Sequence, residues 1–245
     1  MISFLKNHPF AVEAFFERSY VLTFAVPKDQ PRHLIPACLE LDCLNDKWAF
    51  IAVALVQTSG LRPRGFPKIF GSDFFLVGYR AFVTYTNVSG KRLRGLYILK
   101  SETDKRRMEW LGNTFTHYNY TTTDVEQLTN GDNVVITSTR SDFKIDIETG
   151  TGNIPLPINS PFADWKEARR FAGPLPFTFN YNSEKGEVLV VEGVRQNWTP
   201  QPIKIKRCDI SFLRMLNLEA ILANAFVIRK IPYYWKKGKV ESWKK

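Results

Sequence analysis

Residues 74–102 decide the fold class, and they read FFLVGYRAFVTYTN, then VSGK, then RLRGLYILKSE. The first run is rich in aromatic and β-branched residues, which favour a strand. Residues 88–91 carry turn chemistry around Gly90, and the run that follows is again largely apolar. The stretch therefore predicts two long antiparallel strands joined as a hairpin.

Strand patterns recur along the chain between short helical patterns. Residues 46–60 form a nearly continuous apolar run, which predicts a strand buried on both faces and closed by Gly60. Further strands are predicted at residues 20–27, 187–198, 200–212 and 226–235, and within 116–152, where Asn130-Gly131 and Thr149-Gly150 mark turns.

Helices are predicted where the apolar spacing fits a helical period and suitable caps flank it. Residues 103–112 would be capped by Thr103 or Asp104 and end at Gly112, and residues 160–173 would be capped by Ser160. Residues 9–20 and 213–225 also show a helical period. The sum is a mainly β (α+β) fold with a few short helices, organised as a single domain over residues 1–245.

Composition places the protein among soluble, intracellular chains. Of its 245 residues 44% are hydrophobic, which supplies enough apolar material for a core. Three scattered cysteines predict reduced thiols and no disulfide framework. Charged residues interrupt the apolar N-terminus, and no stretch is long enough to span a bilayer. We expect a cytoplasmic protein without a signal peptide or membrane span.

The net charge of +10 is concentrated near the C-terminus, where residues 203–245 hold eleven lysines and arginines against three acidic residues. The end of this segment, YYWKKGKVESWKK, interleaves aromatic and basic side chains. One interpretation is a surface that binds nucleic acid or another anionic surface. The other is a C-terminal strand with its aromatics packed inward and its lysines in water. No recognised nucleic-acid motif accompanies the segment, so nucleic acid is the less favoured partner.

The stretch GNTFTHYNY, residues 112–120, offers the clearest candidate binding groups. Asn113, His117, Tyr118 and Tyr120 would present hydrogen-bonding and stacking groups to a small ligand. The ordinary pKa of histidine, about 6.5, suits proton transfer, so His117 is also a weak catalytic candidate. The alternative is a structural histidine on a strand.

Several chemistries lack their sequence signatures. We find no GxSxG elbow, no GxGxxG or phosphate-binding loop, and no cysteine–histidine cluster, so we expect no cofactor and no metal. Lys100 is a second weak catalytic candidate, because strict alternation would place it on one face with Leu96 and Ile98. If that face lined a cavity, Lys100 could be an amine nucleophile; otherwise its stem covers the core and its ammonium reaches water.

The order of these segments resembles the DUF2071 family, uncharacterised bacterial proteins of the acetoacetate decarboxylase-like superfamily. The similar segments are LTFAVPKDQPRHLIPACLELD, FLVGYRAFVTY, LRGLYILKSETDK, LGNTFTHYNY and ARRFAGPLPFTFNYN. The resemblance implies a closed, barrel-like β fold with a central, largely apolar pocket. Decarboxylases of the superfamily use a lysine that forms a Schiff base, supported by acidic residues.

When the family's pattern is aligned with this sequence residue by residue, the resemblance implies that the site residues have changed. The lysine-bearing stretch aligns with FTHYNY, residues 115–120, which contains no lysine. The family's F.E.N.R pattern aligns its glutamate with Leu76 and its asparagine with Gly78, and only Arg80 is kept. Arg80 is then either an anchor for a carboxylate or phosphate, or the partner of Glu102 in a structural ion pair.

Three functions follow as hypotheses. The first is binding of a small, anionic molecule such as an organic acid, at a site formed by Arg80, Glu102 and the groups of residues 112–120. If this protein is an enzyme, it has a lyase-like activity on a small carboxylic acid that bypasses the usual Schiff base. The second is nucleic-acid or anionic-surface binding by residues 203–245, and the third is a structural or interaction protein with a filled core. A homo-oligomer is compatible with all three.

Overall fold

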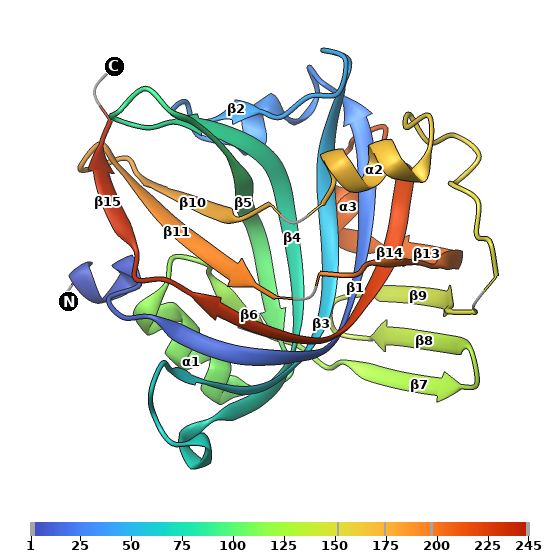
Figure 1. Ribbon diagram of the computed structural model, residues 1–245, viewed down its shortest axis with the longest axis horizontal. Helices are drawn as coiled ribbons and strands as arrows, with labels where there is room; N and C mark the ends of the chain where they lie inside the picture. The colour runs from blue at the N-terminus through green and yellow to red at the C-terminus, as the bar shows by residue number, and fades with distance from the viewer. Residues whose placement is uncertain (1–2, 151, 174, 197, 244–245) are drawn as a thin grey trace.

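The computed structural model describes residues 3–150, 152–173, 175–196 and 198–243. Eleven described strands form one large sheet. They are β1 (Val12–Pro27), β2 (Glu40–Leu41), β3 (Trp48–Pro63), β4 (Ser72–Thr86), β5 (Arg92–Thr103), β6 (Tyr120–Thr122), β10 (Phe177–Asn182), β11 (Glu187–Arg195), β12 (Gln201–Pro202), β14 (Ile221–Trp235) and β15 (Lys239–Ser242). The strand order is β12-β14-β1-β3-β4-β5-β10-β11-β15, and β11 pairs additionally with β14. That pairing closes the sheet into a barrel-like ring (Figure 1).

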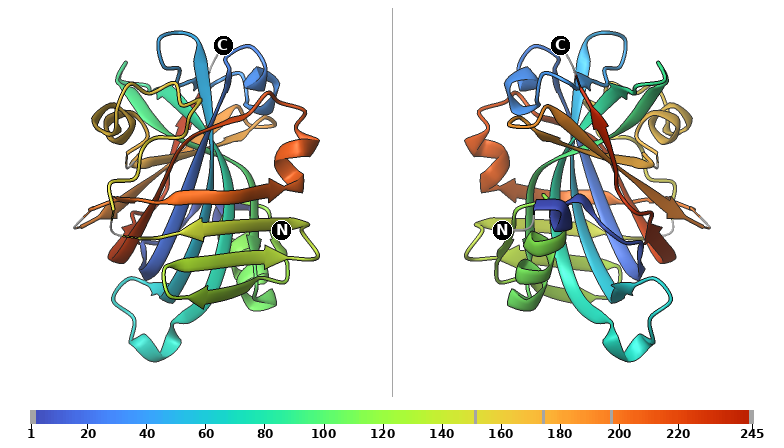
Figure 2. Two further views of the ribbon diagram at one scale, coloured as in Figure 1. Left: turned by 90° about the vertical axis from the view of Figure 1, so that its right-hand side faces the viewer. Right: turned by 90° about the vertical axis from the view of Figure 1, so that its left-hand side faces the viewer.

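A second sheet covers part of the outside of this ring. It contains β7 (Glu126–Asn130), β8 (Asn133–Ser138), β9 (Phe143–Glu148) and β13 (Lys204–Ile210), in the order β13-β9-β8-β7 (Figure 2). Its apolar residues, such as Ile136 and Ile145, pack against Leu22, Leu55 and Val77 of the ring in one buried cluster. The turn predicted at Asn130-Gly131 joins β7 to β8, and β9 ends just before Thr149.

Strand β3 is buried on both faces, as predicted. Val53 and Leu55 point into the core between the two sheets, whereas Ala52 and Ala54 face the inside of the ring. The expected end at Gly60 is wrong: the strand shifts its register between Thr58 and Leu61 and continues to Pro63. Gly60 takes a positive φ of 62° within this irregularity, a conformation that glycine adopts without steric penalty.

The hairpin of residues 74–102 is confirmed as β4 and β5. Residues 76–86 of β4 pair with the whole length of β5, but the register shifts between Tyr79 and Arg80. Tyr79 pairs with Lys100 and Arg80 pairs with Ile98, which leaves Leu99 as an extra residue on β5. A β-bulge of this kind reverses the faces of all side chains beyond it.

Two predicted helices are wrong. Residues 9–20 belong largely to β1, because Phe16 stacks on Tyr233 of β14 at 4.8 Å and the strand pairs on both edges. For residues 213–225, the helix α3 (Ser211–Met215) stops early and β14 begins at Ile221. Asn217 takes a positive φ of 51° between them, which breaks the helix. In both segments, pairing across the sheet outweighs the local helical period.

The other two helices are confirmed with shifted ends. The helix α1 (Arg106–Phe115) begins three residues late, lacks a side-chain cap, and runs through Gly112. The helix α2 (Trp165–Phe171) is capped by Asp164, whose carboxylate accepts a hydrogen bond from the Glu167 N–H, and not by Ser160. The described part also contains the short 3₁₀ turns η1 (Ser3–Asn7), η2 (Pro31–Leu34) and η3 (Lys68–Phe70). No described helix has both the length and the apolar character needed to span a bilayer.

Strands near the C-terminus agree with prediction less closely. The strand at 226–235 is confirmed as part of β14, and residues 200–212 divide into β12, β13 and the start of α3. Strand β11 ends at Arg195, and the predicted position Asn197 lies outside the described residues, as do Thr151, Lys244 and Lys245. Strand β10 was not predicted, and it pairs parallel to β5 in the ring.

Candidate functional site

A cavity of about 260 Å³ lies inside the ring. Strands β1, β3, β4, β5, β11 and β14 contribute to its wall, together with α1 and the segments on either side of it. The lining is mostly apolar, with side chains such as Val56, Phe74, Leu76, Phe82 and Leu96. A concave apolar site of this kind is the usual form of a small-molecule binding site.

Arg80 of β4 projects into this cavity. Its guanidinium folds back over Gly78, where an added Cβ would come within 3.0 Å of the Arg80 Nε and Nη2 atoms. Among the described residues, Arg80 has no hydrogen-bonding or ion-pair partner, and its Nε is buried and unsatisfied. Burial lowers the pKa of Arg80, while the neighbouring Tyr233, Tyr120 and Tyr118 raise it in part. The cavity therefore presents an unpaired cation.

Arg195 supplies a second guanidinium at the seam of the ring, where it pairs with Tyr233 across β11 and β14. Its Nη2 donates to the Leu175 carbonyl at 3.0 Å and to the Tyr233 hydroxyl at 3.2 Å. The guanidinium also lies 4.9 Å from the ring centre of Trp198. Its Nε has no partner among the described residues. Arg195 is thus held in place through its Nη2, while its Nε is left without a partner.

Tyr118 and Tyr120 line the same cavity. The hydroxyl of Tyr118 is buried without a described hydrogen-bond partner. Burial raises the pKa of both phenols, to about 12 for Tyr120, where the positive charge of Arg80 opposes the shift. Both side chains are therefore neutral hydroxyl groups at physiological pH.

The charge balance of the lining is one-sided. The described lining residues include three arginines and no lysine, aspartate or glutamate. Arg62 is neutralised by Glu13, which lies 2.5 Å from it at the edge of the site. Arg80 and Arg195 have no such carboxylate among the described residues. The described lining therefore combines a mostly apolar wall with a net positive charge.

Three of the predicted ligand-binding residues, Asn113, His117 and Glu102, lie off the cavity lining. The Asn113 amide accepts from the Tyr120 N–H at 2.7 Å and donates to the Tyr120 carbonyl at 2.9 Å, so it fixes the backbone that carries Tyr120. His117 Nε2 lies 3.1 Å from Asn7 Oδ1, and burial lowers the pKa of this imidazole. Gly112 leaves room for the Tyr120 ring, which would lie 2.3 Å from an added Cβ.

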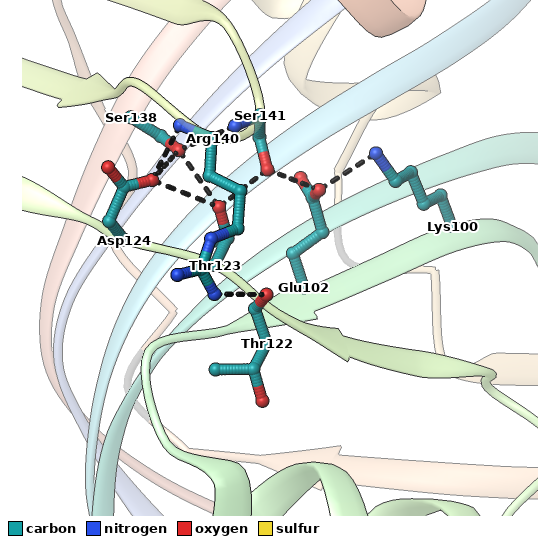
Figure 3. Close-up of polar contacts among 8 residues, drawn as sticks. All are labelled: Lys100, Glu102, Thr122, Thr123, Asp124, Ser138, Arg140 and Ser141. Atoms are coloured by element: carbon teal, nitrogen blue, oxygen red, sulfur yellow. Dashed lines mark hydrogen bonds and ion pairs between the residues drawn. The ribbon is translucent and has the colours of Figure 1, made fainter.

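Lys100 and Glu102 lie on the other face of the sheet (Figure 3). Lys100 Nζ is 2.8 Å from Glu102 Oε1, and the Ser141 hydroxyl donates to the same oxygen at 2.6 Å. The expected face shared by Leu96, Ile98 and Lys100 is wrong beyond Ile98, because the bulge at Leu99 places Ser101 on the cavity instead. An ion pair between Arg80 and Glu102 is therefore not formed.

Removing the Lys100 amine should destabilise the protein. The Glu102 side chain is only 3% exposed, so Lys100→Met leaves a buried carboxylate without its counterion. We expect a loss of roughly 2–4 kcal/mol in the free energy of unfolding, measured by urea denaturation. The double variant Lys100→Met/Glu102→Gln should recover most of this loss, and a double variant as unstable as the single one would contradict the assignment.

Sequence analysis missed most residues of the cavity lining, among them the polar side chains of His8, Arg195 and Tyr233. His8 is buried, takes a positive φ of 52°, and lines the cavity with an unpartnered Nδ1. Its position depends on contacts between η1, α1 and the chain after β14, which no local pattern reveals. Arg195 and Tyr233 could have been found from the sequence. Side chains alternate between the two faces of a strand, and Arg195 shares a face with Val191 and Gly193, which point inward from β11.

Stability should fall as the pH is lowered through the ordinary pKa of histidine. Burial lowers the pKa of His8, so between its folded and unfolded values the unfolded state binds more protons. The contribution of His8 to the free energy of unfolding is therefore complete above pH ~6.5 and decreases as the pH falls below that value. We expect the melting temperature of the wild-type protein to drop more than that of His8→Gln between pH ~7.5 and ~5.5. Parallel curves for the two proteins would contradict this.

The basic C-terminal segment is built into the fold. Tyr233 and Trp235 line the cavity, and Trp243 packs on Tyr181 at 5.7 Å. Its basic side chains are mostly exposed, and Lys206, Lys236 and Lys239 pair with carboxylates. This is the arrangement of an ordinary strand segment with aromatics packed inward and lysines in water.

The chain belongs to the DUF2071 family, described as an uncharacterized conserved protein, whose model matches residues 14–232. No curated protein matches the chain. Its mainly β, single-domain fold is that of acetoacetate decarboxylase, as expected from the sequence.

Three solved structures illustrate the likeness. Acetoacetate decarboxylase from Legionella pneumophila has a TM-score of 0.64 at 11% identity, with 96% of this chain and 88% of that chain covered. The enduracididine biosynthesis enzyme MppR with HEPES bound has a TM-score of 0.62 at 9% identity and the same coverage. An acetoacetate decarboxylase-like enzyme from Sphingomonas wittichii has a TM-score of 0.52 at 11% identity, covering 98% and 93%. At these identities the likeness shows the fold alone.

Proposed function

We propose that the protein binds a small organic acid in the cavity of the ring, with Arg80 holding the carboxylate. The single observation that carries this proposal is the unpaired guanidinium of Arg80 inside an apolar cavity. A buried charge without a partner is unfavourable, and a bound carboxylate would satisfy it through two parallel hydrogen bonds. Arg195 adds positive potential and Tyr118 adds a free hydroxyl beside the same site.

Binding proceeds without a Schiff base in this proposal. An imine needs an amine with a depressed pKa that faces the ligand, and no lysine is found among the described lining residues. Lys100 is directed to the opposite face of the sheet and is paired with Glu102. A structure of MppR was determined with pyruvate, which supports the view that this fold can hold a small organic acid.

A thermal-shift panel tests the binding step. Short and medium-length carboxylic acids and 2-keto acids are each added to the wild-type protein and to Arg80→Gln at constant ionic strength. An acid at about a hundred times its Kd adds roughly 2.7 kcal/mol of stability. We expect the melting temperature to rise for wild type and to stay unchanged for Arg80→Gln.

The matched control is Arg92→Gln, which removes an exposed arginine from the neighbouring strand β5. It should respond to acids as wild type does. If no acid in the panel raises the melting temperature, or if Arg80→Gln responds like wild type, the proposal is wrong.

Borohydride trapping tests the absence of an imine. The protein is incubated with a 2-keto or 3-keto acid, reduced, and measured by intact mass spectrometry beside an authentic acetoacetate decarboxylase. We expect the decarboxylase to gain one reduced adduct, with the mass of the ketone left after CO2 is lost from a 3-keto acid, minus one oxygen, and this protein to remain unmodified. A stoichiometric adduct mapped to one lysine would contradict the non-covalent mechanism while leaving the acid as ligand.

A further inference from the structure

Several polar side chains surround Arg80 in the cavity. The electrostatic neighbours of Arg80 are Tyr233, Tyr120, Tyr118 and Arg195, which come from three segments of the chain. The rest of the described lining is mostly apolar, with His8, Arg62 and a few hydroxyl side chains among the apolar ones. A ligand that fits both parts has one anionic end and a mostly apolar body.

An apolar part of the wall continues from Arg80 along β3, β4 and α1. Val56, Phe74, Leu76 and Met108 form one buried cluster there, and Phe16 packs against it. The Arg80 guanidinium is turned toward this wall, because it folds back over Gly78 in the direction of Leu76. A carboxylate bound to Arg80 would thus have its substituent next to Leu76 and Val56.

The volume of the cavity indicates the size of that substituent. A dry apolar cavity of about 150 Å³ holds one benzene molecule. By the same measure, this cavity of about 260 Å³ has room for roughly ten non-hydrogen atoms. Pyruvate and acetoacetate are clearly smaller and would leave apolar wall exposed to trapped water.

We propose that the preferred ligand is a monocarboxylate with an apolar body of about eight carbons, lying along the wall of Phe16, Val56, Phe74 and Leu76. Straight-chain acids such as octanoate and aryl acids such as 3-phenylpropanoate meet this description. The inference rests on the proposed function, because it assumes that Arg80 binds the carboxylate. The inference adds to the proposed function that the acid carries a large apolar substituent. The short keto acids named for neighbouring structures have no such substituent.

A chain-length series tests the inference by isothermal titration calorimetry. Affinity should rise roughly tenfold for every two carbons from butanoate to octanoate, as expected for burial of methylene groups, and then level off or fall at dodecanoate. Octanol should bind much more weakly than octanoate, because it lacks the charge that Arg80 recognises. Titrations are carried out below the concentration at which the acids form micelles.

Two variants locate the apolar body. Val56→Phe should weaken octanoate at least tenfold and leave butanoate nearly unchanged, because Val56 lines the cavity. Val88→Phe, the same enlargement at an exposed position outside the described lining, should leave both acids unchanged. A Val56→Phe variant that binds octanoate as wild type does would overturn the proposed placement. If Val56→Phe does not fold, the wild-type series still decides whether the body is recognised.

The outcomes separate this inference from the proposed function. If short acids bind through Arg80 and affinity does not increase with chain length, the inference is wrong and the proposed function stands. If no acid of any length binds, both are wrong. If octanol binds as tightly as octanoate, the cavity recognises apolar bodies alone, which contradicts the role of Arg80.

Discussion

Arg80→Leu is expected to raise the stability of the ligand-free protein by roughly 1–3 kcal/mol, although it removes a charged side chain. The Arg80 Nε is buried with no described partner, so the wild-type protein carries an uncompensated desolvation penalty at this position. Leucine would pack against Leu76 and Phe82, which face the same cavity. For a chain of this size, the melting temperature should rise by on the order of 5 °C.

The same substitution should abolish binding of organic acids. Higher stability together with lost binding is typical of a residue kept for function at the expense of the folded state. Arg92→Leu, at an exposed position, is the control and should change the melting temperature little. A large loss of stability in Arg80→Leu would show that Arg80 is a structural residue, and the account of the cavity would fail.

Gly95→Ala is expected to cause a large loss of stability for a substitution that adds one methyl group. Gly95 pairs with Phe177 where β5 and β10 run parallel to each other in the ring. A Cβ at this position would lie 2.4 Å from the Phe177 carbonyl oxygen and 2.6 Å from the Phe179 ring. Because the first of these atoms belongs to the backbone, the strands must separate, and we expect a loss of about 3 kcal/mol or more in urea denaturation.

Gly152→Ala is the matched control for Gly95→Ala. No atom lies within 4 Å of its added Cβ and its backbone is not in the left-handed region, so the free energy of unfolding should change by less than about 0.5 kcal/mol. Equal stability of the two variants would show that the pairing between β5 and β10 is looser than described.

The sequence predicted those parts of the fold that depend on strong local patterns. The hairpin of β4 and β5 and the doubly buried strand β3 follow from long runs of aromatic and β-branched residues. Residues 9–20 and 213–225 were misassigned because short apolar segments fit a helical period as well as a strand. Their pairing partners lie far away in the sequence, as in the contact between Phe16 and Tyr233.

The candidate site was predicted in part. Arg80, Tyr118 and Tyr120 lie on the cavity, while Asn113, His117, Lys100 and Glu102 do not line it. The decisive feature for Lys100 is one extra residue in β5, which alternation alone cannot reveal. His8 reaches the cavity through the packing of η1 against α1 and the chain after β14, so it required the tertiary structure, whereas the alternation along β11 could have indicated Arg195.

The most direct test is a crystal structure of the protein grown with the carboxylic acid that raises its melting temperature most. We predict that the acid lies inside the ring, with a carboxylate oxygen about 2.7–2.9 Å from the Arg80 guanidinium and no covalent bond to the protein. An acid bound outside the cavity, or bound inside it with Arg80 still unpaired, would contradict the account.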